Sequence, residues 1–146
     1  EPQATFSACF GEPFMPMHPG VYADLLSAKM AEHGATAWLI NTGWSGGAYG
    51  VGERMKIRYT RAMLNAALDG ELDHVAYVTD ARFGFEVPAS CPGVPDDVLQ
   101  PRETWGDGAA YDATADRLAQ MFNENFSRYA EGVSDAVNAA APAPLS

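Results

Sequence analysis

The residues best suited to chemistry in this 146-residue chain gather in one short segment, residues 50–61. Four of the nine basic residues lie within eight positions of it, namely Arg54, Lys56, Arg58 and Arg61. A glycine-rich stretch precedes them, and a predicted helix with Thr60 as its N-cap follows. Guanidinium groups at a helix N-terminus form a site for an anion. The alternative is a solvated basic turn that pairs with acidic neighbours such as Asp69 and Glu71.

Other patterns that would indicate a reaction are missing from the sequence. It holds no G-x-x-x-x-G-K-[ST] P-loop, and both lysines lack a preceding glycine. The glycines of residues 43–52 do not have the G-x-G-x-x-G spacing of dinucleotide-binding folds. The histidines are scattered and far in sequence from both cysteines, so we predict no zinc site.

Composition narrows the class of protein. The formal net charge is −10 and only two residues are lysines, so binding to nucleic acid is not expected. The sequence contains no run of 18 apolar residues, so no membrane span is predicted. Its start lacks both an initiating Met and the features of a signal peptide, so we expect a processed or truncated chain. Cys9 and Cys91 favour two reduced, buried thiols in a cytoplasmic protein. The alternative is a secreted domain with a Cys9–Cys91 disulfide.

Apolar spacing and turn residues predict an alternation of helices and short strands. The expected elements are a helix from Pro19 to Gly34, a buried strand at 37–40, a helix from Thr60 to Gly70, strands at 75–78 and 83–87, a helical turn at 96–99 and a helix at 110–129. This order indicates an α/β fold, a mixed α+β layer over residues 1–130, whose small sheet would be completed by strands from further chain. An Ala/Pro-rich tail, residues 131–146, is expected to be flexible.

Six blocks of sequence follow one another along the chain: TFSACFG (5–11), NTGW (41–44), GVGxRMKI with TRA (50–62), CPGVP (91–95), PRxTW (101–105) and FxxNF (122–126). In this order they resemble the ATP-dependent phosphoenolpyruvate carboxykinases, from residue 1 to about residue 129. The resemblance implies the C-terminal piece of that family's nucleotide-binding domain. It also implies conversion of oxaloacetate and ATP to phosphoenolpyruvate, ADP and CO₂, a step of gluconeogenesis that Mg²⁺ and Mn²⁺ assist.

The resemblance also assigns roles to individual residues. The family's ATP contacts in this region fall on Arg54, Met55 and Thr60. The guanidinium of Arg54 suits ribose or phosphate oxygens, Met55 offers backbone and apolar contact to the base, and Thr60 offers a hydroxyl. Glu53 departs from the lysine expected beside the arginine. The P-loop, metal ligands and substrate-binding arginines of the family lie upstream of the matched region.

Three expectations follow for the chain itself. As an isolated piece it should have no carboxykinase activity and bind ATP weakly or not at all. It should expose an apolar surface toward the rest of the same polypeptide and therefore self-associate. The alternative function is a non-catalytic module that kept the fold and uses its basic turn for another anion or a partner protein.

Overall fold

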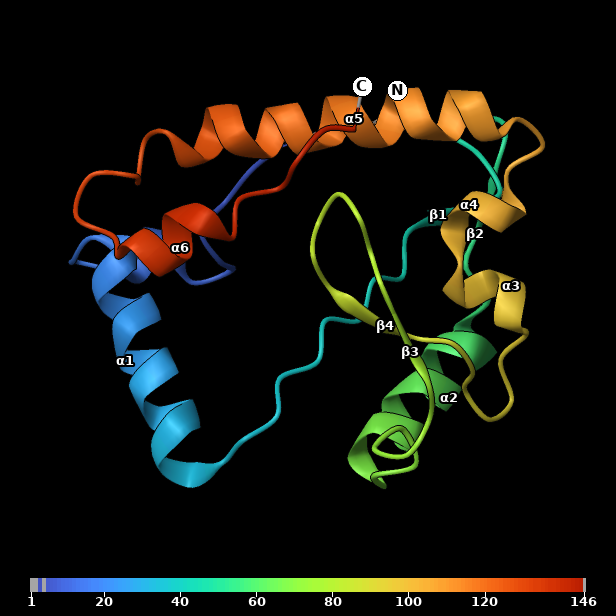
Figure 1. Cartoon of the computed structure of the whole chain (residues 1–146), viewed down its shortest axis with the longest axis horizontal. Helices are drawn as coiled ribbons and strands as arrows, with labels where there is room; N and C mark the ends of the chain where they lie inside the picture. Colours follow the sequence, from blue (N-terminus) through green and yellow to red (C-terminus); the bar gives the residue numbers. More distant parts are fainter. Residues whose placement is uncertain (1–2, 4, 146) are drawn as a thin grey trace.

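The computed structural model describes residues 3 and 5–145 and consists of helices joined by loops and two small hairpins (Figure 1). The longer helices are α1 (Pro19–His33), α2 (Ile57–Leu68) and α5 (Gly108–Phe126). The short helical segments are η1 (Glu12–Phe14, a 3-10 turn), α3 (Asp96–Leu99), α4 (Pro101–Thr104) and α6 (Asp135–Ala139). The strands are β1 (Trp44–Ser45), β2 (Glu53–Arg54), β3 (Tyr77–Thr79) and β4 (Glu86–Pro88).

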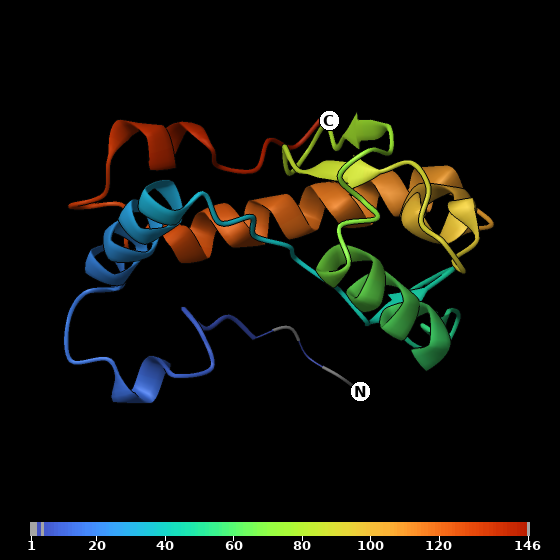
Figure 2. The ribbon, with the colours of Figure 1, turned by 90° about the horizontal axis from the view of Figure 1, so that it is seen from below.

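The arrangement is open. Helix α5 runs along one side, with α1 and α6 near its C-terminal end and α3, α4 and the hairpin of β1 and β2 near its N-terminal end (Figures 1 and 2). The accessible surface is 10432 Å² for a mass of 15.6 kDa. A compact monomer of that mass exposes about 7200 Å². Much of the surface that a closed domain would bury therefore faces solvent. Of the described helices, not one combines the length and the apolar content that crossing a bilayer requires.

Helix α1 begins and ends where its local sequence predicts. Pro19 occupies the first turn, where its missing N–H costs nothing, and the Nδ1 of His18 caps the start by accepting from the Gly20 amide at 3.1 Å. At the other end Gly34 adopts φ 61°, the left-handed conformation that only glycine takes without strain. Along its length only Gly20 is buried, so α1 has little covering it.

Helix α2 begins earlier than predicted, which corrects the assignment of Thr60 as its N-cap. The cap is Lys56, with extended dihedrals (φ −65°, ψ 130°), and its carbonyl accepts from the Tyr59 amide at 2.9 Å. Thr60 lies in the first turn, because the chain enters the helix directly from β2. The predicted end is confirmed, since the helix stops at Leu68 and Gly70 takes φ 74°.

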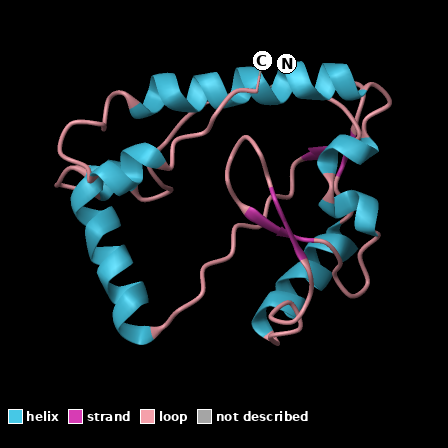
Figure 3. Ribbon diagram, in the orientation of Figure 1, coloured by secondary structure: helices cyan, strands magenta, loops and turns pink. Residues whose placement is uncertain are grey.

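The strands form two separate antiparallel pairs rather than one layer (Figure 3). β3 pairs with β4 in the register Val78 opposite Val87, so both strands predicted here are confirmed, with bounds shifted from those predicted. The strand predicted at 37–40 is wrong: the described structure has no strand there, and Leu39 is 78% exposed. An extended apolar run becomes a strand only when a neighbour pairs with it, and none does. The fold is thus a mixture of helices and short strands without the expected α+β layer.

The core is small and lies at the α2 end of the molecule. Its cluster of buried residues consists of Ala66, Leu72, Cys91, Val94 and Leu99. Trp38 packs against this cluster and stacks on Tyr77, with ring centroids 6.4 Å apart. Cys91 is buried as predicted, whereas Cys9 is exposed, which corrects that half of the prediction; both thiols are free. Large apolar side chains elsewhere are exposed, including Leu26 at 63% and Phe10 at 103%.

Helix α5 supports the loop between β3 and β4. Its N-cap Asp107 accepts from the amides of Ala109 and Ala110 at 2.9 and 3.1 Å. The buried Asp116 pairs with Arg82 of the loop between β3 and β4, Nε to Oδ1 at 2.6 Å. One residue further along that loop, Phe83 meets Phe122 edge-on with centroids 6.1 Å apart.

The segment predicted as a tail contains α6 and returns to α5. The Leu145 amide donates to Oδ1 of Asp116 at 2.9 Å, and the Ala143 amide donates to the Arg82 carbonyl at 2.7 Å. No residue of α6 is buried. The flexibility of residues 131–146 and the boundary at residue 130 stay predictions.

Candidate functional site

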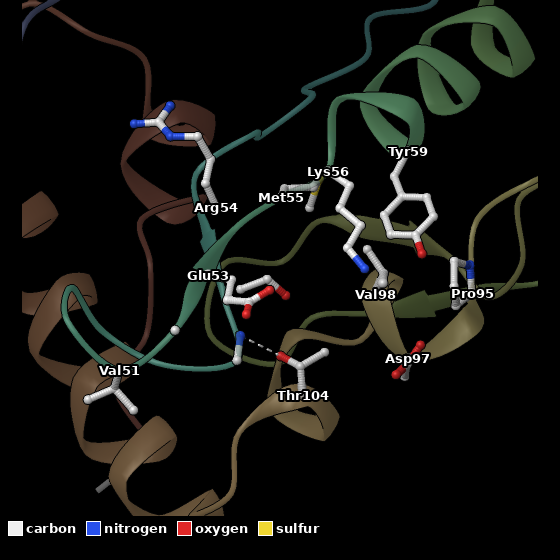
Figure 4. A pocket seen from close by; sticks show the side chains of 13 residues that line it. Val51, Glu53, Arg54, Met55, Lys56, Tyr59, Pro95, Asp97, Val98 and Thr104 are labelled. Carbon is white, nitrogen blue, oxygen red and sulfur yellow. Dashed lines mark hydrogen bonds between the residues drawn. The ribbon is translucent and has the colours of Figure 1, made fainter.

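A cleft of about 390 Å³ lies between the hairpin of β1 and β2, the start of α2 and the short helices α3 and α4 (Figure 4). The residues that line it are Ser45, Gly46, Val51, Gly52, Glu53, Arg54, Met55, Lys56, Tyr59, Pro95, Asp97, Val98 and Thr104. The predicted basic segment therefore forms one wall, and residues from much later in the chain form the other.

The first wall is built by a hairpin that the sequence did not predict. Trp44 pairs with Arg54 and Ser45 with Glu53, and the Met55 amide donates to the Gly43 carbonyl at 2.9 Å. Glycine is required where the chain doubles back: a Cβ on Gly52 would lie 2.6 Å from the Ser45 carbonyl oxygen. The glycines that argued against regular structure thus permit two short strands to approach each other.

The four cations of the basic segment make no ion pairs with acidic side chains of the described residues. Within residues 3 and 5–145, no ion pair joins Arg54, Lys56, Arg58 or Arg61 to a carboxylate, so the pairing with Asp69 and Glu71 is not formed. Arg58 instead donates to the Tyr59 hydroxyl at 2.8 Å and lies 4.8 Å from that ring.

Only two of the three residues assigned to ATP by resemblance line the cleft. Arg54 and Met55 line the cleft, whereas Thr60, half-buried in the first turn of α2, is not among the lining residues. The Arg54 guanidinium lies 5.8 Å from the Trp44 ring and points away from Lys56 and Tyr59 (Figure 4). The guanidinium makes a cation–π contact at the rim, where Arg54 is exposed.

Several lining residues were missed by sequence reasoning. Tyr59 lies three residues after Lys56 in the same segment, and that proximity was the one available signal. Asp97 and Thr104 arrive from α3 and α4, and nothing near them in the sequence predicts their place. The Gly46 amide donates to the Thr104 hydroxyl oxygen at 3.1 Å, which joins the two walls (Figure 4).

The formal charges of the lining cancel. Arg54 and Lys56 contribute two positive charges, and Glu53 and Asp97 contribute two negative ones. Metal ions have no ligand set either, because the described part of the chain contains no group of three His, Cys, Asp or Glu side chains that could hold one. The residues present therefore do not fit Mg²⁺ or Mn²⁺, and this cleft suits an uncharged polar or apolar part of a ligand better than a polyanion.

Comparison with known proteins agrees with the sequence blocks. The profile of the family described as phosphoenolpyruvate carboxykinase matches residues 1–97. A protein of Geotalea uraniireducens (strain Rf4) named "Phosphoenolpyruvate carboxykinase (ATP)" is 60% identical over 137 residues, which cover 94% of this chain and 26% of the relative. Proteins of the same name from Sinorhizobium fredii and Thermus thermophilus are 58% and 57% identical over 142 residues, covering 97% of this chain and 26% and 27% of those relatives.

The matches define a class of protein, the phosphoenolpyruvate carboxykinases. The chain belongs to the ATP-dependent phosphoenolpyruvate carboxykinase family. It spans about a quarter of the length of the curated relatives it matches. The predicted family membership is therefore confirmed.

Proposed function

We propose that this chain is the C-terminal portion of the nucleotide-binding domain of an ATP-dependent phosphoenolpyruvate carboxykinase and supplies one wall of its ATP site. The complete protein would convert oxaloacetate and ATP to phosphoenolpyruvate, ADP and CO₂ in the cytoplasm. ATP and oxaloacetate are then its substrates. Any Mg²⁺ or Mn²⁺ that takes part would be held by residues outside this chain.

The observation that carries the proposal is the cleft that Arg54 and Met55 share. Met55 is half-buried and contributes an apolar side chain to the lining, to which the Tyr59 ring also belongs. Because the lining charges cancel, we assign this wall to the base and ribose of ATP, while the triphosphate lies toward the rest of the polypeptide. Arg54, at the exposed rim, is free to turn from Trp44 toward a ribose or phosphate oxygen.

The open surface supports a partner that belongs to the same polypeptide. The accessible area exceeds that of a compact monomer by roughly 3000 Å², and apolar side chains such as Leu25 and Leu26 of α1 are more than half exposed. In the complete protein the remaining chain would cover this surface. Produced alone, the 146-residue chain should self-associate.

Phosphoryl transfer depends on lysine, arginine and metal ions placed around the transferred group. Of these elements the proposal gives this chain Arg54 alone, so we expect no carboxykinase turnover from the isolated chain. Turnover of oxaloacetate by the purified 146 residues would contradict that part of the proposal.

The site is tested by substitution in the complete gene product. Arg54→Ala should raise KM for ATP by about tenfold or more, since a hydrogen bond from a charged group contributes roughly 1.5–3 kcal/mol. Arg117→Ala, which removes an exposed guanidinium from α5, is the matched control. Thr60→Val measures whether a residue outside the lining contacts ATP. Equal KM values for the Arg54 and Arg117 variants would refute the ATP site. Polyanion binding without turnover would indicate a binding module instead.

A further inference from the structure

We propose that Thr104 is a positioning residue for this cleft: it fixes the glycine loop, residues 46–52, on α4 and thereby sets the wall that meets ATP. The inference rests on the proposed function, because Thr104 would affect ATP through that wall. Thr104 belongs to the PRxTW block, for which the family resemblance supplied no role.

The hydroxyl of Thr104 donates one hydrogen bond and accepts another. It donates its proton to the Pro101 carbonyl at 2.7 Å and accepts the Gly46 amide at 3.1 Å. Because the proton is used within α4, a lone pair is directed at the loop. The loop backbone also lies directly on α4, since a Cβ on Gly46 would be 3.4 Å from the Thr104 carbonyl oxygen.

Helix α4 is in turn anchored to α5. Arg102 donates to Asp112 through Nε at 3.0 Å and through Nη2 at 2.9 Å. The same hydrogen bonds lower the pKa of Asp112. Arg102 reaches across the start of α5 because Gly108 has no side chain: a Cβ there would lie 3.0 Å from Nη2. Trp105 adds an edge-on contact with Tyr111 at 5.5 Å.

A short path leads from the loop to the residue assigned to the nucleotide. Gly46 follows Ser45, which pairs with Glu53 across the hairpin. Arg54 is the next residue, and its partner is Trp44. A shift of the Gly46 backbone therefore moves the strand that carries Arg54, although no hydrogen bond joins Thr104 to Arg54 in the described part of the chain.

The test compares three variants of the complete gene product. Thr104→Val removes the acceptor, Thr104→Ser keeps it, and Thr114→Val makes the same chemical change on α5, where the hydroxyl donates to Ala110 at 2.8 Å. The measurements are kcat, KM for ATP, KM for oxaloacetate, and amide hydrogen exchange of residues 46–52 by mass spectrometry.

Thr104→Val should raise KM for ATP about fivefold, the effect of one neutral hydrogen bond. It should leave KM for oxaloacetate unchanged and speed exchange in residues 46–52, while Thr104→Ser restores both values. Identical behaviour of the Thr104→Val and Thr114→Val variants would overturn the inference. If Arg54→Ala raises KM for ATP and Thr104→Val does not, positioning fails and the ATP site stands. If neither Arg54→Ala nor Thr104→Val changes KM for ATP while residues 46–52 exchange faster, the proposed ATP site is refuted. The positioning role of Thr104 is then refuted with it.

Discussion

The ion pair between Arg82 and Asp116 offers the sharpest test of how the chain is held together. Asp116 is 4% exposed, and its Oδ1 accepts from both Arg82 Nε and the Leu145 amide. Asp116→Asn keeps the shape and one acceptor oxygen but removes the negative charge. Removing one partner of a buried pair costs about 3–5 kcal/mol. Because Arg82 retains Asp112 at 3.4 Å, we expect the free energy of unfolding to fall by about 2–3 kcal/mol.

The assay is urea denaturation of the complete gene product followed by circular dichroism, with amide hydrogen exchange at Leu145 as the local readout. Glu32→Gln is the control, since it makes the same carboxylate-to-amide change in the Lys29–Glu32 pair, whose side chains are 66% and 59% exposed. Exposed pairs contribute roughly 0–1 kcal/mol. Equal losses for the two variants, with protection at Leu145 unchanged, would refute the assignment of Arg82 and Asp116 as a structural pair.

Three further outcomes can be measured on the same protein. Cys9, which is exposed, should be alkylated quickly, while Cys91 should react slowly until urea unfolds the chain, because burial raises the pKa of its thiol. Equal alkylation rates of the two cysteines, measured by peptide mass spectrometry, would contradict this. Gly52→Ala should disrupt the hairpin, whereas Gly50→Ala, with open space but φ 87°, should cost only about 1–2 kcal/mol in denaturation; the reverse ranking would count against the hairpin. Asp107→Ala should destabilise α5 by about 1 kcal/mol through loss of its cap, and an unchanged urea midpoint would be inconsistent with that cap.

The sequence predicted those elements whose ends depend on local chemistry. Pro19 and Gly34 mark the ends of α1 because a missing N–H and a left-handed turn are properties of single residues. The start of α2 could not be read in this way, since Lys56 became its cap through the pairing of β2 with β1. The apolar run at 37–40 had the content of a strand, but strand formation requires a partner that the described chain does not provide.

The residues of the candidate site can be separated in the same way, into those indicated by local sequence and those brought in by packing. Arg54 and Met55 were predicted because they lie in a conspicuous basic segment and a family block. Asp97 and Thr104 face them from a separate part of the chain, and only the packing of α3 and α4 brings them there. Thr60 was expected from its place at the predicted helix start as well as from the resemblance, and the contacts of all three residues with ATP stay predictions.

The loop between β3 and β4 contacts α5 at two points, and this limits how the helix can change in evolution. Arg82 and Phe83 are consecutive, yet they hold Asp116 and Phe122, which are about 9 Å apart along the helix axis. A single residue inserted between those two positions would rotate one anchor by about 100° relative to the other. The loop could then satisfy the ionic or the aromatic contact but not both, so the spacing of these anchors should tolerate substitutions far better than insertions or deletions.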